Sequence, residues 1–287
     1  MDLHDHGLAS DLEMMRQQAF ERRQVLRWLL AGAATLPLMS CGGGSDAGGT
    51  AASGGVTGTS GGAGSVTIPA AGACTVIPEE TGGPYPADGT NTNGGSIINV
   101  LNQSGVVRSD IRASFNGATG VAAGVPLTIN LQLLNASGGC ASLAGYAVYL
   151  WHCDRDGLYS LYSSGVTAQN YLRGVQETDS AGKLAFTTIF PGCYAGRMPH
   201  VHFEVYPSLA KAASAMNRIK TSQFTFPMAT LNEAYTASGY TASVRNLAQI
   251  SYATDNVFAD GTSLQMATVT GNATDGYVVT LTVAVNG

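Results

Sequence analysis

Short apolar or alternating runs, separated by clusters of turn residues, make up the chain from Cys74 to its carboxyl terminus. Runs of this length bounded by Gly, Asn, Asp and Ser are typical of β-strands, and no segment shows a long apolar period of 3.6 residues. Only 208–219 and 231–237 suggest short helices. The pattern predicts an all-β fold, a single β-sandwich of mixed strands with long loops and one or two short helices. The strand candidates are PLTINLQLLNA (126–136), GYAVYLWHCD (145–154), KLAFTTIF (183–190), HVHFEVY (200–206), SQFTFPM (222–228), SLQMATVTG (263–271) and GYVVTLTVAV (276–285).

The composition agrees with an exported β-protein. Charged residues are only 11% of the 287-residue chain, whereas hydrophobic residues reach 45%, which is ample for a core. The net charge is −5, and no basic patch or run indicates nucleic acid as a partner.

The first 41 residues resemble a targeting signal rather than part of the folded domain. The pair Arg22 and Arg23 precedes an apolar run, 28–39, that is too short to span a bilayer as a helix. The segment resembles a twin-arginine export signal. It ends at Cys41 in LMSC, which resembles a bacterial lipobox, although Met and Ser depart from the usual pattern. We expect a periplasmic or cell-surface lipoprotein whose only membrane contact is a lipid on Cys41, or otherwise a secreted protein with an ordinary cleaved signal.

Residues 42–73 separate this signal from the rest of the chain. They are almost all Gly, Ser, Ala and Thr, with Asp46 as the one charge. Such a segment cannot bury enough apolar surface to become ordered, so we expect a disordered tether. The folded domain is predicted at residues 74–287.

Two histidines stand on one predicted strand. After residue 41 the only histidines are His152, His200 and His202. Alternate side chains of a strand share a face, so His200 and His202 lie close together and can both bind a transition metal. The alternative is a half-exposed strand with ordinary surface histidines. The turn before this strand favours a functional site, because it places Tyr194 and Arg197 within a few residues of the two histidines.

The remaining ligands must be of another type. His200, His202 and Glu204 suggest a cupin-like iron or zinc site, but no later histidine exists to complete one, so we expect Glu204 at the outer end of the strand or in a salt bridge. Tyrosine is abundant, at 12 copies. A phenol has a free pKa near 10, but a trivalent metal favours its phenolate strongly. Two phenolates with two imidazoles select Fe(III) over Zn(II) or Fe(II).

Two longer stretches resemble a known family. They are LAGYAVYLWHCDRDGLYSLY (143–162) and YLRGVQETDSAGKLAFTTIFPGCYAGRMPHVHF (171–203). Both are similar to the intradiol ring-cleavage dioxygenases, the family of catechol 1,2-dioxygenase and protocatechuate 3,4-dioxygenase. The family's first iron tyrosine follows a G-x-Y turn, and its second lies in a P-G-x-Y turn before the H-x-H pair. The resemblance implies a non-haem Fe(III) held by Tyr159, Tyr194, His200 and His202.

The same resemblance implies roles around the substrate. Arg197 matches a charge-stabilising arginine, and Gln223 matches a glutamine beside the substrate. IPEETGGPYP (77–86) resembles the family's pocket-lining segment, which would put Thr81 and Tyr85 near the substrate, although GGPY is also a plain turn. Tyr194 is also implied as a base.

The implied activity is cleavage of a catechol-type diol. Both atoms of O2 would enter the ring between its two oxygenated carbons to give a cis,cis-muconate-type product. Catechol, protocatechuate, hydroxyquinol and plant or lignin-derived diols all remain open as substrates. We expect a monomer, because the tether stands where dimeric relatives carry an associating helical segment. A twin-arginine route carries folded proteins, which would let iron load before export.

Other readings of the same residues stay open. One is a non-enzymatic exported β-sandwich binding module, and another is an H-x-H zinc or Fe(II) enzyme. We expect structural roles for three side chains near the motif: a hydrogen bond for His152, packing for Tyr162, and a loop contact through a carboxylate for Arg173.

The cysteines after Cys41 are even in number. In an exported chain this favours two disulfides over free thiols, with three pairings open. Because Cys153 and Cys193 each lie close to a candidate tyrosine, we favour Cys153 with Cys193 and Cys74 with Cys140.

Overall fold

The computed structural model describes residues 75–287 of the chain. The predicted signal (1–41), the lipidation site at Cys41 and the predicted tether (42–73) lie outside the described residues and stay predictions. Within the described part, no helix is both long and apolar enough to cross a bilayer.

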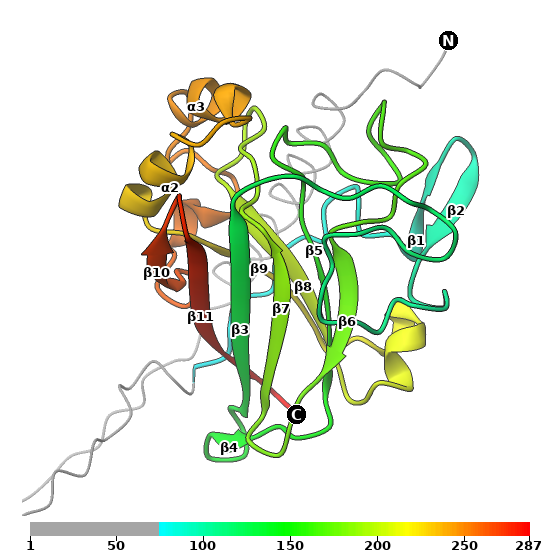
Figure 1. The fold of residues 1–287 in the computed structure, drawn as a ribbon. Helices are drawn as coiled ribbons and strands as arrows, with labels where there is room; N and C mark the ends of the chain where they lie inside the picture. Colours follow the sequence, from blue (N-terminus) through cyan, green and yellow to red (C-terminus); the bar gives the residue numbers. More distant parts are fainter. Residues whose placement is uncertain (1–74) are drawn as a thin grey trace, which may run out of the picture.

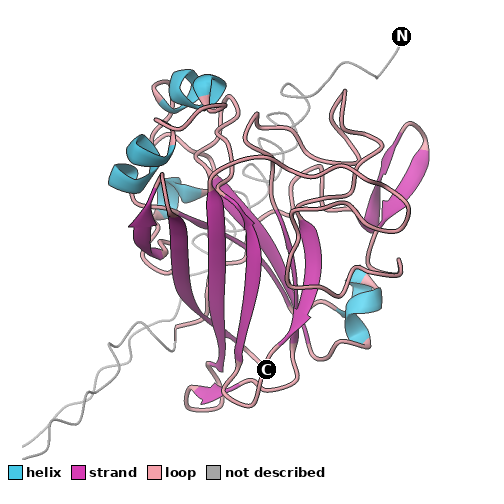
Figure 2. Cartoon of the chain, viewed as in Figure 1, coloured by secondary structure: helices cyan, strands magenta, loops and turns pink. Residues whose placement is uncertain are grey.

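The described part is dominated by β-strands, with short helices at its margins (Figures 1 and 2). The strands and helices, in chain order, are β1 (Asp88–Asn93), β2 (Ser96–Asn99), β3 (Pro126–Asn135), β4 (Ala141–Ser142), β5 (Ala147–Trp151), β6 (Arg173–Glu177), β7 (Lys183–Ile189), β8 (His200–Tyr206), η1 (Lys211–Ala213), η2 (Ala215–Asn217), β9 (Lys220–Thr225), α2 (Met228–Ala234), α3 (Thr241–Leu247), η3 (Phe258–Asp260), β10 (Thr268–Asn272) and β11 (Gly276–Val285).

Two sheets form the sandwich. The five-stranded sheet runs β10-β11-β3-β4, and β7 also pairs with β3. Its β11–β3 pair is parallel, whereas the other pairs are antiparallel. The second sheet, β6-β5-β8-β9, is antiparallel throughout. A separate hairpin, β1–β2, stands at one side of the molecule (Figure 1). The predicted all-β sandwich with mixed strands is therefore confirmed.

The main core lies between the two sheets. In β3 every second residue from Leu127 to Leu133 is buried, while the residues between them are half-buried. These side chains form one cluster with Val148 and Leu150 of β5 and with the core-facing residues of β8, which are Val201, Phe203 and Val205. The alternation that was visible in the sequence therefore decides which face of each strand enters the core.

The four-stranded sheet is buried on its other face as well. There Tyr149, Trp151 and Tyr206 belong to a second cluster, packed under the loops that connect the strands. Every residue of β5 and of β8 is buried. His200 and His202 alternate with the core residues and so point into this second, loop-covered layer. They are not on a half-exposed strand.

The sequence missed some elements and misjudged others. Each predicted strand is present, but β4, β6 and the β1–β2 hairpin were not predicted, because none of them alternates clearly between apolar and polar residues. The helix expected at 208–219 is two 3₁₀ turns, η1 and η2. They are separated by Ser214, which is extended and accepts the backbone N–H of Met216. The candidate at 231–237 overlaps α2, and α3 was missed.

The predicted Cys153–Cys193 disulfide is wrong. Both cysteines are free and buried. The Cys153 side chain belongs to the loop-covered cluster and that of Cys193 to the main core, so the two face different layers. Burial raises the pKa of the Cys193 thiol to about 12. Cys140 is disulfide-bonded, and its partner lies outside the described residues.

Thiol labelling checks this correction. Without reductant, we expect iodoacetamide to modify Cys153 and Cys193 only after the protein is unfolded, because both thiols are buried and protonated in the fold. Cys140 serves as the internal control, since it should react only after reduction. Peptide mapping by mass spectrometry distinguishes the sites. A Cys153–Cys193 cross-link in the unreduced digest would contradict the structure.

Candidate metal centre

The candidate site lies at one end of the four-stranded sheet. In the antiparallel register Trp151, the last residue of β5, faces His202 near the start of β8. The loop that follows β5 and the loop that precedes β8 therefore leave the sheet at the same end. The first loop carries Tyr159 and the second carries Tyr194, so the strand pairing brings both tyrosines to the histidines.

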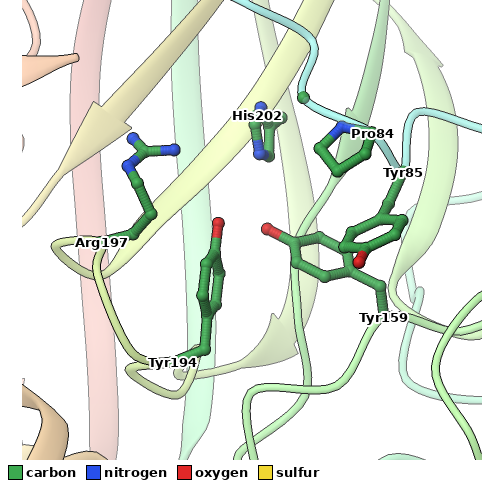
Figure 3. Close-up of a pocket in the computed structure, with 7 residues that line it drawn as sticks. Pro84, Tyr85, Tyr159, Tyr194, Arg197 and His202 are labelled. Atoms are coloured by element: carbon green, nitrogen blue, oxygen red, sulfur yellow. The ribbon is translucent and has the colours of Figure 1, made fainter. Parts of the chain in front are cut away.

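Four side-chain atoms converge there. The Nε2 atom of His200 lies 3.0 Å from Nε2 of His202. It lies 3.4 Å from the hydroxyl oxygens of both Tyr159 and Tyr194. Figure 3 shows the two hydroxyls pointing into the same space, beside the His202 ring. Tyr159 and both histidines are buried, whereas Tyr194 is half-buried.

The protein orients both imidazoles. His200 donates its Nδ1 proton to the carbonyl of Met198 at 2.6 Å, so its Nε2 presents a lone pair to the other three groups. The His202 ring stacks on Trp151, with ring centres 4.9 Å apart and planes 2° apart. Burial lowers the pKa of both histidines well below the usual value, with a smaller contribution to His200 from Arg197. Both imidazoles are thus neutral, which is the state that binds metals.

This donor set fits a metal ion. Nε2 of His200 carries a free lone pair because Nδ1 holds the proton, and one further nitrogen and two oxygens lie 3.0–3.4 Å from it. Burial raises the pKa of Tyr159 well above its usual value, so that phenol ionises only if a cation compensates. No group of three or more His, Cys, Asp or Glu side chains in the described part of the chain could hold a metal. A metal centre here therefore depends on the two tyrosines.

Two glycines bring the pieces together. Gly157, the glycine of the G-x-Y turn, has φ +84°, and a Cβ atom there would lie 2.9 Å from Cβ of Tyr194. Gly83 has φ +66°, and its Cβ would lie 3.4 Å from Cε1 of His202. Both positions have a left-handed backbone that favours glycine, and at Gly157 a larger residue would also push the Tyr159 loop away from Tyr194.

Arg197 is fixed beside the cluster. Its Nη2 donates to Gln223 Oε1 at 2.7 Å, and its Nε donates to Asp255 at 3.0 Å. Asp255 is fully buried and also accepts the backbone N–H groups of Met198, Val257 and Phe258. The sequence did not single out Asp255. The only signal was its place in DNVFADG, far along the chain from the motif.

The pocket at this cluster is small. It has a volume of about 230 Å³, part of it open to solvent, and is lined by Gly83, Pro84, Tyr85, Tyr159, Tyr194, Arg197 and His202. Tyr85 lies in the wall, with its ring centre 5.0 Å from that of Tyr159. Thr81 and Gln223 are outside the lining. The Thr81 carbonyl accepts a hydrogen bond from Gln223 Nε2 at 2.8 Å.

Other residues near the motif have structural partners. His152 donates from Nδ1 to the Cys153 carbonyl and accepts at Nε2 from the Thr188 hydroxyl, both at 2.7 Å. Glu204 accepts a hydrogen bond from Tyr206 and pairs with Arg218 at 3.6 Å, as the salt-bridge expectation proposed. Burial raises the pKa of Glu204 to about 8, with a further contribution from Asp88.

Comparison with known proteins gives a consistent result. Residues 108–227 match the family model described as Dioxygenase. The chain resembles the solved intradiol ring-cleavage dioxygenase of Tetranychus urticae, with TM-score 0.56 and 23% identity over 74% of this chain and 95% of that one. A second solved dioxygenase matches with TM-score 0.55 and 23% identity over the same shares. The dioxygenase domain of a fusion protein from Streptomyces sp. SirexAA-E matches at 0.46 and 22% identity, over 74% and 99%. The first two likenesses show a shared fold.

The buried Arg197–Asp255 pair gives a stability prediction. We expect Asp255→Asn to lower the free energy of unfolding by about 3–5 kcal/mol, because it leaves a buried guanidinium without its counter-charge. The matched control is Asp110→Asn, which breaks the exposed Arg112 pair of 2.7 Å and should cost less than about 1 kcal/mol. Urea unfolding of the metal-free protein measures both. Equal losses of unfolding free energy in the two variants would show that the buried ion pair contributes no more to stability than the exposed one.

His152 gives a pH prediction. Burial lowers its pKa to about 4, so the folded protein keeps it neutral while the unfolded chain binds a proton below about pH 6.5. Stability must therefore fall as the pH is lowered from 6.5 towards 4, by about 3 kcal/mol for this residue. Unfolding free energies across this range should fall less steeply in His152→Leu than in the wild type. Parallel pH profiles would contradict the assignment.

Proposed function

We propose that this chain, whose residues 108–227 match the Dioxygenase family model, uses Fe(III) and O2 to cleave a catechol-type diol to a cis,cis-muconate-type product. The match of residues 108–227 to this family model, together with the shared fold, supports a ring-cleaving oxidoreductase. The ferric ion, the diol and the product are our proposal. The observation that carries it is the convergence of the His202 Nε2 atom and two phenol oxygens on Nε2 of His200, each at 3.0–3.4 Å from it, beside a pocket.

The ferric ion would be held by Tyr159, Tyr194, His200 and His202. The chemistry that Fe(III) supplies in such a site is Lewis-acid binding of the two substrate oxygens and electron exchange with the ring and O2. A hard trivalent ion suits the two phenolates, because it compensates the charge that burial otherwise disfavours.

The pocket supports a small aromatic substrate. Its seven lining residues include three tyrosines and a proline, so the walls offer flat apolar surfaces to an aromatic ring. Tyr85 and Pro84 form an apolar wall opposite Arg197 (Figure 3), so a flat ring would lie between an aromatic face and a cation. Arg197 is the cation in this lining, and its fixed guanidinium would stabilise negative charge on the substrate oxygens.

The two tyrosines differ in a way that supports different roles. Tyr159 is 2% exposed and follows a glycine packed against Tyr194, so it would stay in place. Tyr194 is half-buried on the short loop before β8 and has more room to move. As a phenolate, its hydroxyl oxygen would accept a proton from the substrate hydroxyl.

The cellular setting is proposed from the sequence. We infer that the enzyme is exported through its twin-arginine-type segment and acts as a monomer, with membrane contact only through a lipid on Cys41. Small aromatic diols and O2 are then its partners outside the cytoplasm.

Oxygen uptake with a series of diols tests the function. The iron-loaded protein should consume one O2 per diol and show the charge-transfer colour of ferric tyrosinate, and Tyr159→Phe and Tyr194→Phe should each lower the rate by about 100-fold or more. Thr280→Ala, an exposed change on the far sheet, is the matched control. A folded, colourless protein without uptake would favour a binding module. An active, metal-dependent enzyme that tolerates Tyr159→Phe would favour a zinc or Fe(II) site.

A further inference from the structure

Arg173 is a buried cation beside the pocket without an acidic partner. It opens β6, opposite Trp151 of β5, and is 1% exposed. The expectation that it holds a loop through a carboxylate is wrong, because none of the ion pairs among the described residues includes it. A buried guanidinium needs partners for its five N–H groups, so its hydrogen bonds show what it is for.

One side of the guanidinium holds the loop of Tyr159. Its Nε donates to the Ser160 hydroxyl and its Nη2 donates to the Ser160 carbonyl, both at 3.0 Å. Ser160 in turn donates its hydroxyl proton to the carbonyl of Tyr171 at 2.7 Å. Ser160, which directly follows Tyr159, is therefore held by hydrogen bonds at both its side chain and its backbone.

The other side of the guanidinium holds the wall segment of the pocket. Its Nη1 donates to the carbonyls of Tyr85 at 2.9 Å and Pro86 at 3.1 Å. It also lies 3.2 Å from the hydroxyl of Tyr149, which donates to the Pro86 carbonyl at 2.7 Å. One planar group therefore spans the segment of Tyr85 and the segment of Tyr159, whose rings are 5.0 Å apart in the pocket.

The backbone beside each contact is unfavourable on its own. Ala87, Leu161 and Leu172 have positive φ values of 54°, 73° and 58°, although none is glycine. Ala87 directly follows Pro86, and Leu161 directly follows Ser160. Leu172 directly precedes Arg173. Such conformations persist only where surrounding contacts determine them. The three segments that meet at the guanidinium are thus held in shapes that they would not adopt alone.

We propose that Arg173 is a positioning residue of the site, which sets the separation of the Tyr85 wall from the Tyr159 loop and so orients the Tyr159 phenol. As far as it concerns ligand and substrate, this inference rests on the proposed function. The role requires the planar fork of an arginine, because a lysine carries three donors on one nitrogen and cannot reach both segments at once.

Hydrogen–deuterium exchange of the metal-free protein tests the positioning directly. Arg173→Lys keeps the charge and Arg173→Met keeps much of the volume, and both should speed exchange in peptides covering 83–88 and 157–163 while β3 and β11 stay unchanged. Val279→Ala, in the core of the other sheet, is the matched control and should give the opposite pattern. Unchanged exchange in both pocket peptides, or a uniform increase across the chain, would overturn the proposal.

Ser160→Ala covers the case in which the Arg173 variants do not fold. It keeps the arginine and removes one acceptor, so it should speed exchange in 157–163 and leave 83–88 nearly unchanged. If residues 157–163 exchange equally fast in Ser160→Ala and in the wild type, Arg173 does not hold this loop through the Ser160 hydroxyl.

Iron-loaded protein tests the consequence for the ligand. In Arg173→Lys we expect a shifted charge-transfer band and a kcat/KM lowered by about 10- to 100-fold, with KM raised because the Tyr85 wall moves. Val279→Ala should keep the wild-type band and KM. A coloured wild type whose band and KM survive Arg173→Lys would overturn the inference while leaving the function intact. A colourless wild type would remove the proposed function, and the exchange pattern would still decide whether Arg173 positions the two segments.

Discussion

Burial of both faces of β8 is the constraint on which the site depends. A strand covered on one face by the sandwich core and on the other by loops must provide a partner for every polar side chain it carries. Glu204 has Tyr206 and Arg218, and His200 has the Met198 carbonyl. The Nε2 atoms of the two imidazoles lie 3.0 Å apart, and the two phenol oxygens lie 3.4 Å from that of His200. Unsatisfied electron pairs therefore gather at one point, which is what a cation requires.

The parts of this arrangement that follow a period could be predicted from the sequence, and the parts that depend on distant contacts could not. Alternation in HVHFEVY placed His200 and His202 on one face. Tyr159 lies on a loop, where no period applies, so only its turn motif and the family resemblance identified it. Asp255 is 58 residues from Arg197, and its role appears only in the fold. The Cys153–Cys193 pairing failed because closeness in sequence to the site does not reveal which layer a side chain faces.

Two arginines flank the cluster, and the positive charge of each is compensated in a different way. Arg197 has a buried carboxylate at 3.0 Å as its counter-charge. Arg173 has carbonyl and hydroxyl oxygens instead, so its charge is solvated by dipoles and remains effective at short range. After burial and His200, both arginines lower the pKa of His202. The protein thus favours neutral imidazoles before any cation arrives.

This charge pattern favours phenols in the proposed ligand set. Neutral imidazoles bind a cation through their lone pairs, but the two guanidinium groups nearby disfavour a trivalent ion, so such an ion would be held only if negative charge appeared with it. The two phenols can supply that charge by releasing their protons as the ion binds, which couples metal binding to deprotonation. Carboxylates in the same place would be ionised in the absence of metal and could pair with Arg197 instead. Buried tyrosines stay neutral until a cation is present, which keeps Arg197 committed to Asp255 and Gln223 and leaves the centre of the cluster to the ion.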